Sequence, residues 1–163
     1  EQFHELVMLP CYQWNRCVVV PPKHPLMKLK KLTLEAINQY PIITYDFAFT
    51  GRSKINQAFA SRGLEPNVVL TAIDSDVIKT YVELGLGIGI LANMAFDVKR
   101  DKNLRAIDAS HLFEPSTTRI GISRNNYIRS YIFDFIEMFA PHLTHDSIQA
   151  KLDSKLHDAE NSN

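Results

Sequence analysis

The chain has 163 residues, an apolar fraction of 45%, and 18 basic against 18 acidic side chains. These values suit one packed globular domain or part of one, and the zero net charge gives no broad electrostatic attraction to nucleic acid. Any DNA-contacting part is therefore expected outside this chain. No apolar run approaches the roughly 20 residues of a membrane helix, and the N-terminal residues lack a signal-peptide pattern, so we expect no membrane contact and a cytoplasmic location.

Short apolar runs closed by proline open the chain. The stretch HELVMLP predicts a buried strand that stops at Pro10, and a second strand, Cys17 to Val20, is closed by two prolines. Thr33 is expected to cap a short helix that ends near Tyr40, because Pro41 follows. The run IITYD then predicts another strand.

Helices and strands alternate through the middle of the chain. Apolar residues recur at helical spacing from Thr50 to a stop at Gly63, and NVVLTAI predicts a strand. The segment SDVIKTYVELG predicts a helix capped by Asp74 or Ser75 and stopped by Gly85, after which IGILA predicts a strand. Strands that alternate with helices indicate crossover connections, and hence an α/β fold with a mostly parallel sheet covered on both faces.

The C-terminal third is less regular. A polar segment from Phe96 to Pro115 contains LRAID as an edge strand, and TTRIGISR predicts a further strand. The stretch YIRSYIFDFIEMFAPHL predicts the strongest helix of the chain, which ends at Pro141. After Leu152 the chain is polar, and we expect a frayed tail. The apolar positions of the predicted helix, at helical spacing, are Ile128, Tyr131, Ile132, Phe135, Ile136 and Phe139.

Motifs for catalysis or metal binding are not found in the sequence. The closest of the six histidines, His142 and His145, have no acid or thiolate at metal-ligand spacing, and a solvated helix end explains them better. Cys11 and Cys17 are too few for a disulfide framework or a zinc site, and we interpret them as free thiols of a reduced compartment. There is no nucleophile elbow and no Walker loop. The sequence therefore predicts that the chain is not an enzyme, with no catalytic residue, no metal and no cofactor.

The glycine-rich run GLGIGI superficially resembles a dinucleotide-binding fingerprint. It follows a helix and precedes a strand, which is the wrong order for phosphate binding. Gly85 is interpreted as the helix stop, whereas Gly87 and Gly89 allow close packing or a close backbone approach near a ligand. The acids Asp74 and Asp76 are explained as residues of a first helical turn.

The loop DFAFTG is the best candidate for ligand binding. It follows a strand and opens a helix, and ligands of open α/β sheets bind outside the carboxyl ends of the strands. Thr50 offers a hydroxyl, Gly51 permits close approach, and the backbone N–H groups of Gly51, Arg52 and Ser53 lie at the positive end of the helix dipole. This arrangement suits a carboxylate or a sulfate.

Other residues are expected near the same sheet edge. Tyr45 belongs to the strand before this loop, and Asp74 lies in the loop TAIDSD that opens the next helix. Trp14, the only tryptophan, lies in the segment CYQWNR and offers an indole N–H that suits an anionic oxygen. The residues alone leave open a plainer interpretation, in which Thr50 is only a helix cap and Trp14 only a packing residue.

The stretch VELGLGIGILA resembles the glycine-rich helix-to-strand segment of LysR-type transcriptional regulators. Further stretches resemble the CysB and Cbl branch, which controls sulfur assimilation and cysteine biosynthesis in bacteria. The resemblance extends from about Leu6 to Thr144. The supporting stretches are LVMLPCYQWNR, HPL, QYPIITYDFAFTGRS, VVLTAIDSDVIKTYVELGLGIGILA, STTRIGISR and RSYIFDFIEMFAPHLT.

The resemblance implies an effector-binding domain of two α/β subdomains like those of periplasmic binding proteins. It places residues 1–9 at the end of the first subdomain, 10–115 in the second, and 116–145 in a return to the first, with 146–163 as a tail. The implied effector is N-acetylserine, O-acetylserine, sulfate or thiosulfate. The family's anion-site tryptophan and threonine correspond to Trp14 and Thr50.

The resemblance also implies partners. Promoter DNA would be bound only through an N-terminal winged helix-turn-helix outside this chain, with the effector domains forming a homodimer or homotetramer and RNA polymerase as a further partner. The apolar face of the last predicted helix would need cover from a companion segment or from another copy. The alternative function is a solute-binding protein for a small anion, which shares this fold.

Overall fold

The computed structural model describes residues 6–46, 50–123 and 128–160, without the side chains of residues 50, 51 and 154–160. The chain divides into two units. We call Trp14–Ser116 the central unit, and Glu1–Gln13 with Thr117–Asn163 the terminal unit. That these units are the two effector subdomains stays a prediction.

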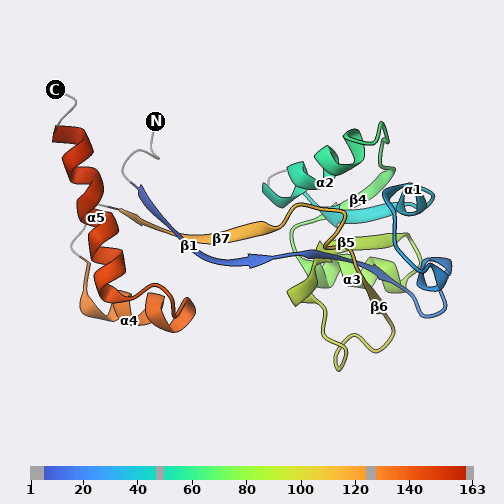
Figure 1. The fold of residues 1–163 in the computed structure, drawn as a ribbon. Helices are drawn as coiled ribbons and strands as arrows, with labels where there is room; N and C mark the ends of the chain where they lie inside the picture. The colour runs from blue at the N-terminus through green and yellow to red at the C-terminus, as the bar shows by residue number, and fades with distance from the viewer. Residues whose placement is uncertain (1–5, 47–49, 124–127, 161–163) are drawn as a thin grey trace. The chain divides into compact units, whose positions relative to one another are not determined.

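The central unit is built on one sheet with the strand order β4-β3-β5-β2-β6 in the described residues (Figure 1). Its strands are β2 (Arg16–Val20), β3 (Ile42–Tyr45), β4 (Val68–Ala72), β5 (Ile88–Ala92) and β6 (Arg105–Asp108). Its helices are η1 (Pro25–Lys28), α1 (Leu34–Ile37), α2 (Thr50–Ala60), α3 (Ser75–Glu83) and η2 (Asn93–Ala95).

Strand direction confirms the α/β fold and refines it. β3 pairs in parallel with both β4 and β5, as crossover helices require. β2 pairs antiparallel with both β5 and β6. β2 therefore runs against the other strands, and the sheet is mixed rather than uniformly parallel.

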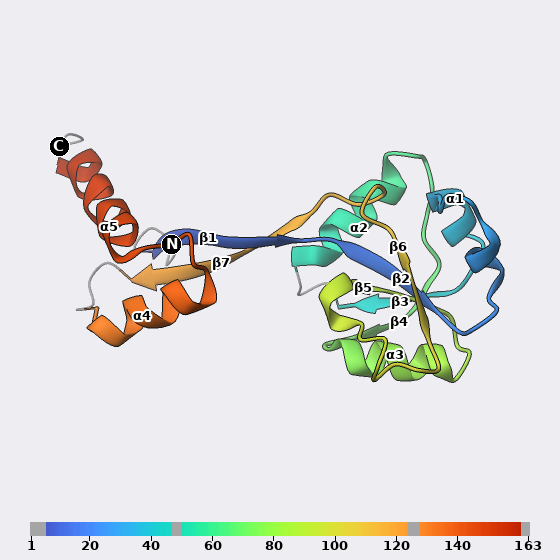
Figure 2. The same ribbon diagram turned by 60° about the horizontal axis from the view of Figure 1, so that its bottom comes forward.

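Helices cover both faces of this sheet (Figure 2). Successive side chains of a strand point to opposite faces, and β2 is buried along its whole length. Val18 and Val20 pack with Ile55 and Phe59 of α2 on one face. On the other face, Val19 packs with α3. A strand buried on both sides explains the unbroken apolar run that the sequence shows.

The expected helix signals are present. Thr33 caps α1 by accepting a hydrogen bond from Ala36 N at 3.2 Å, and Asp74 caps α3 by accepting from Val77 N at 2.9 Å. Gly63 and Gly85 follow α2 and α3 with φ of 65° and 76°, the left-handed conformation that glycine adopts without strain. The glycine stops are therefore confirmed.

The terminal unit pairs β1 (Leu6–Trp14) with β7 (Ser116–Ser123), and both strands extend one residue into the central unit. Two helices follow, α4 (Ser130–Phe139) and α5 (His145–Glu160). The unit has its own core. That core contains Val7, Leu9, Cys11, Ile122, Phe133, Ile136, Ala140, Leu143, Ile148 and Leu152.

Two expectations about this unit are wrong. Pro10 does not stop the first strand, because β1 continues to Trp14. A proline has no N–H to give to a ladder, but β1 has one partner strand in the described residues, and an edge strand tolerates the missing donor. The tail is also not frayed where it was expected to be, because α5 extends to Glu160 and buries Ile148 and Leu152 against the core.

The apolar face of α4 is only partly covered. Ile136 is buried, whereas Tyr131 and Phe135 are 60% and 58% exposed. Phe133, outside the predicted face, is buried instead, and Met138 is 80% exposed. The isoleucines of the predicted face thus pack in or against the core, whereas its aromatic side chains stay in solvent, as expected for a face that needs cover from elsewhere. Among the described residues, no helix is both long and apolar enough to cross a membrane.

Candidate functional site

The topology of the central unit gathers the predicted site residues at one edge of its sheet. β3 and β4 are parallel and end at Tyr45 and Ala72, which are register partners. β2 runs the other way, so its first residue, Arg16, lies at the same edge and pairs with Ala92 at the end of β5. Trp14, the start of α2 and the cap of α3 are therefore all placed at this edge.

The α2 end of this edge begins as predicted. Thr50 and Gly51 are the first residues of the helix, although their side chains lie outside the described part. Arg52 is only 3% exposed. Its Nη1 donates to the Tyr45 carbonyl at 3.3 Å, and its Nε donates to Asn56 Oδ1 at 3.0 Å. Arg52 therefore connects the end of β3 to the first turns of α2.

Tyr45 and Asp74 lie near each other at the same edge. Burial raises the pKa of the Tyr45 phenol, and the charge of Asp74 raises it further, so the phenol stays protonated. Asp74 is exposed, and one of its oxygens is used as the α3 cap. Asp46 follows β3 and accepts a hydrogen bond from Thr71 Oγ1 at 3.2 Å. Protonated donors and carboxylate acceptors are thus both present.

Arg16 lies at the same edge, although the sequence motifs did not indicate it as a site residue. It is 2% exposed, and its guanidinium carbon lies 5.1 Å from the centre of the Trp14 ring. Burial lowers the pKa of Arg16, but arginine keeps its charge in proteins. An arginine at the start of the buried strand RCVVV was the available signal, because a charge at the end of a buried strand needs partners.

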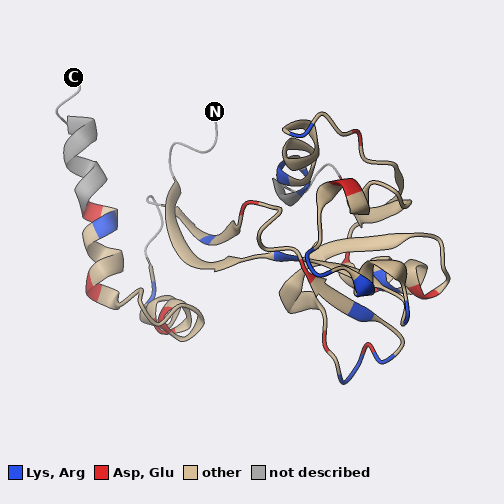
Figure 3. Cartoon of the chain, turned by 45° about the vertical axis from the view of Figure 1, so that its right-hand side comes forward, with Lys and Arg blue, Asp and Glu red and all other residues tan. Residues whose placement is uncertain are grey.

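Charge at this edge is mixed. Two buried guanidinium groups, on Arg16 and Arg52, lie there with the N-terminal end of the α2 dipole, and all three favour a bound anion. The carboxylates of Asp46 and Asp74 repel an anion that lies close to them, but they can accept hydrogen bonds from the neutral part of a ligand. Basic and acidic residues are interspersed elsewhere on the central unit (Figure 3). The edge can therefore select a small anion that also carries hydrogen-bond donors.

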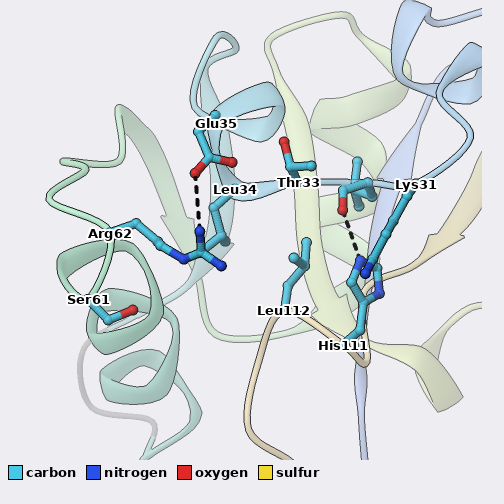
Figure 4. Close-up of a pocket in the computed structure, with 9 residues that line it drawn as sticks. Lys31, Thr33, Leu34, Glu35, Ser61, Arg62, His111 and Leu112 are labelled. Carbon is cyan, nitrogen blue, oxygen red and sulfur yellow. Dashed lines mark hydrogen bonds and ion pairs between the residues drawn. The ribbon is translucent and has the colours of Figure 1, made fainter.

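A separate pocket of about 370 Å³ lies at the opposite end of α2 (Figure 4). Glu35 and Arg62 form an ion pair across it at 3.9 Å, and His111 Nε2 is 2.8 Å from the Leu32 carbonyl. α2 has 11 residues, and a helix rises 1.5 Å per residue, so this pocket is about 16 Å from the Thr50 turn. It contains none of the predicted site residues.

Other chemistry has little support in the described residues. No group of three or more His, Cys, Asp or Glu side chains there is placed to hold a metal ion. Cys11 and Cys17 are free and buried. Burial and the charge of Asp108 raise the pKa of Cys17 to about 12, so this thiol is not a reactive thiolate.

Comparison with known proteins gives a consistent result. The family model described as LysR substrate binding domain matches residues 1–144. The chain is 56% identical over 152 residues to the HTH-type transcriptional regulator SsuR of Burkholderia cenocepacia, which covers 93% of the chain and 49% of that protein. It is 53% identical over 147 residues to the HTH-type transcriptional regulator CysB of Haemophilus influenzae, covering 90% of the chain and 45% of that protein. The chain thus spans about half the length of these curated relatives.

Solved structures show the same relationship. The cofactor-binding domain of the Cbl transcriptional regulator superposes with a TM-score of 0.87 at 41% identity, covering 93% of this chain and 66% of that chain. The effector-binding domain of QuiR in complex with shikimate has a TM-score of 0.73 at 19% identity, covering 88% of this chain and 69% of that one, and this likeness concerns the fold alone.

Proposed function

The chain belongs to the LysR substrate-binding domain family, and we propose that it is the inducer-binding part of a transcriptional regulator of sulfur assimilation and cysteine biosynthesis. Its relatives carry the names of transcriptional regulators, and we propose no enzymatic activity for it. The observation that carries the proposal is the gathering of Trp14, Arg52 and the α2 start at one sheet edge in a chain of this family. The regulator would act in the cytoplasm, where its promoters are.

The proposed effector is a small anion: N-acetylserine, O-acetylserine, sulfate or thiosulfate. Its negative group would accept hydrogen bonds from the backbone N–H groups of Gly51, Arg52 and Ser53 and from the Thr50 hydroxyl. The buried Arg52 charge beneath that turn supports this orientation. Tyr45 and Asp74 would contact the uncharged part of an acetylated serine.

Trp14 would contact the effector from the neighbouring strand end. Its ring is half-buried, so part of it is accessible to a ligand. The indole N–H can donate to a carboxylate or sulfate oxygen but cannot accept. This fits the proposed sign of the effector charge, because the site then consists of donors around one anionic group.

The effector would act by shifting a population. A ligand changes the balance between two arrangements of the effector domain only by its difference in affinity for them. That shift would reach promoter DNA through a winged helix-turn-helix outside this chain, and RNA polymerase would be a further partner. We also propose that effector domains associate into dimers or tetramers.

The α4 surface bears on that association. Tyr131, Phe135, Met138 and Phe139 are at least 41% exposed, and an apolar group of this kind in solvent favours burial against another surface. A second copy or a companion segment of the effector domain would provide it. Equilibrium sedimentation of the chain and of its Phe135→Asp variant tests whether a second copy covers this surface. A chain that dimerises and a variant that does not would support association through α4. A chain that is monomeric without the substitution would exclude it.

Calorimetric titration with each of the four proposed effectors tests the function. The result expected is saturable binding of at least one of them, with Arg62→Met, at the opposite end of α2, unchanged in affinity. Thermal shift with shikimate serves as the control for a carboxylate of unrelated chemistry. Absence of binding by all four compounds, in a protein that includes the rest of the effector domain, would reject the proposed effector class.

A further inference from the structure

Arg16 has an unusual place in the central unit. It is a charged residue with 2% of its surface exposed, at the first position of β2. Its Nη1 donates to the Glu114 carbonyl at 2.9 Å, and its Nη2 donates to Ser116 Oγ at 2.9 Å. The remaining face of the guanidinium lies toward the Trp14 ring at 5.1 Å. One planar group thus contacts three separate positions of the chain.

These positions coincide with the points where the chain crosses between its two units. The chain enters the central unit at Trp14 and leaves it after Ser116. Arg16 is two residues from the entry, and its hydrogen-bond partners, Glu114 and Ser116, are the last residues before the exit. The Arg16 carbonyl also accepts from Ala109 N at 3.2 Å, which fixes the backbone that carries the side chain.

The geometry assigns Arg16 as a positioning residue: it holds the Trp14 ring at the effector edge and ties that ring to both crossing segments. An effector that contacts Trp14 would then change the restraint on both segments at once. Arginine suits this role because its rigid fork donates in plane while its flat face stacks on an aromatic ring. The inference rests on the proposed function for its effector, but the Arg16–Trp14 contact can be tested without one.

Trp14 provides a direct readout, because it is the only tryptophan in the chain. In the Arg16→Met variant the ring loses its cationic neighbour, and we expect a red-shifted emission and stronger acrylamide quenching. Arg16→Lys keeps the charge but not the fork, and an intermediate response is expected. Arg62→Met, which removes an exposed arginine of the same unit, is the matched control and should leave emission unchanged.

Effector binding and hydrogen exchange then separate positioning from simple bracing. We expect Arg16→Met to weaken N-acetylserine or sulfate binding by up to roughly three- to tenfold, because the effector must then order the Trp14 ring that one cation–π contact otherwise holds in place. Effector-dependent protection of the amides of residues 14–17 and of residues 114, 116 and 117 should appear in the natural chain and be reduced in the variant. If Arg16 only stabilised the fold, Arg16→Met would lower the melting temperature but leave the effector-dependent protection unchanged.

The outcomes are decisive in each case. Unchanged Trp14 emission and quenching in a folded Arg16→Met protein would overturn the inference. If that variant does not fold, Arg16→Lys and Ser116→Ala take its place. Trp14 emission and effector affinity equal to those of the natural chain in both variants would equally overturn the inference. If a protein that includes the rest of the effector domain binds none of the four proposed effectors, the proposed function fails, while the emission of the Arg16 variants still decides the positioning role.

Discussion

Gly87 offers a sharp test of how the glycine-rich segment acts. A Cβ at this position would lie 2.5 Å from the Pro41 carbonyl oxygen, where real Cβ contacts are essentially never below 3.0 Å. The neighbour is backbone and cannot rotate away, and the same oxygen accepts the hydrogen bond of Ile88 N at 2.8 Å. Gly87→Ala must therefore push apart β5 and the start of β3, or lengthen that bond.

The size of the effect follows from two opposing terms. Overpacking of this kind costs about 1–3 kcal/mol, while replacing glycine stabilises by about 0.4–1 kcal/mol through the unfolded chain. The free energy of unfolding of the central unit should therefore fall by about 1–2 kcal/mol. Each kcal/mol lowers the melting temperature of a unit of this size by about 4–8 °C, which calorimetry or circular dichroism resolves.

Gly121→Ala is the matched control. Its Cβ would meet the Met8 Sδ at 3.2 Å, the flexible part of a partly exposed side chain that can move aside. Its unfolding free energy should change by no more than about 0.5 kcal/mol. A Gly87→Ala protein as stable as the natural chain would refute the close-packing explanation of this segment, and a loss of effector binding alone would favour a ligand-approach role instead.

Three further substitutions give separate tests. Thr50→Ala should weaken effector binding by about 1–2 kcal/mol in calorimetry, the value for losing a hydrogen bond to a charged group, and unchanged affinity would reject a direct role for Thr50. His24 accepts a hydrogen bond from Leu26 N at 3.3 Å through Nδ1, and burial lowers its pKa below 6.5, so the stability it contributes is present above pH 6.5 and is lost as the pH falls through the folded pKa. Denaturant unfolding between about pH 7.5 and 5 should therefore be less pH-dependent in His24→Asn, and an identical profile would contradict this. Lys79→Met should cost about 3 kcal/mol in the same assay, because the largely buried Asp101 carboxylate keeps its hydrogen bond from Asp97 N but loses the opposite charge at 3.1 Å, and Asp101→Asn in that background should recover part of the loss.

Much of the central unit could be predicted from local sequence signals. Thr33 and Asp74 cap helices with their own side chains, and Gly63 and Gly85 end helices, because these effects act within a few residues. The strand-helix alternation likewise gave the α/β class. The register and direction of the strands could not be predicted in this way, because the antiparallel orientation of β2 depends on partner strands that are distant in the sequence.

Long-range contacts explain what the sequence missed. Arg16 bonds to residues 98 and 100 positions away, so nothing near it shows where its guanidinium goes. Lys79 lies on α3 and is 7% exposed, because its ammonium group donates to the Ala95 carbonyl at 3.0 Å, 16 residues away in the sequence. The predicted apolar face of α4 is divided: Ile136 is buried and Ile132 packs against the same core, whereas Phe135 stays exposed, as expected for a face that needs cover from a companion segment or another copy.

The site was predicted in location more than in detail. Strand ends and helix starts can be read from the sequence, and in parallel strands they must share an edge. The role of Arg52 could not be read, because its bonds to Tyr45 and Asn56 depend on the turn between β3 and α2. These two hydrogen bonds indicate that Arg52 fixes the conformation of the α2 start, in addition to any contact with the effector.

One measurement tests the central claim most directly: an NMR titration of the ¹⁵N-labelled chain with N-acetylserine. The account predicts saturable shifts of the single indole N–H resonance, from Trp14, together with the amide resonances of Gly51, Arg52 and Ser53. Saturable shifts confined to Glu35, Arg62 and their neighbours, at the far end of α2, would contradict it and place the effector elsewhere.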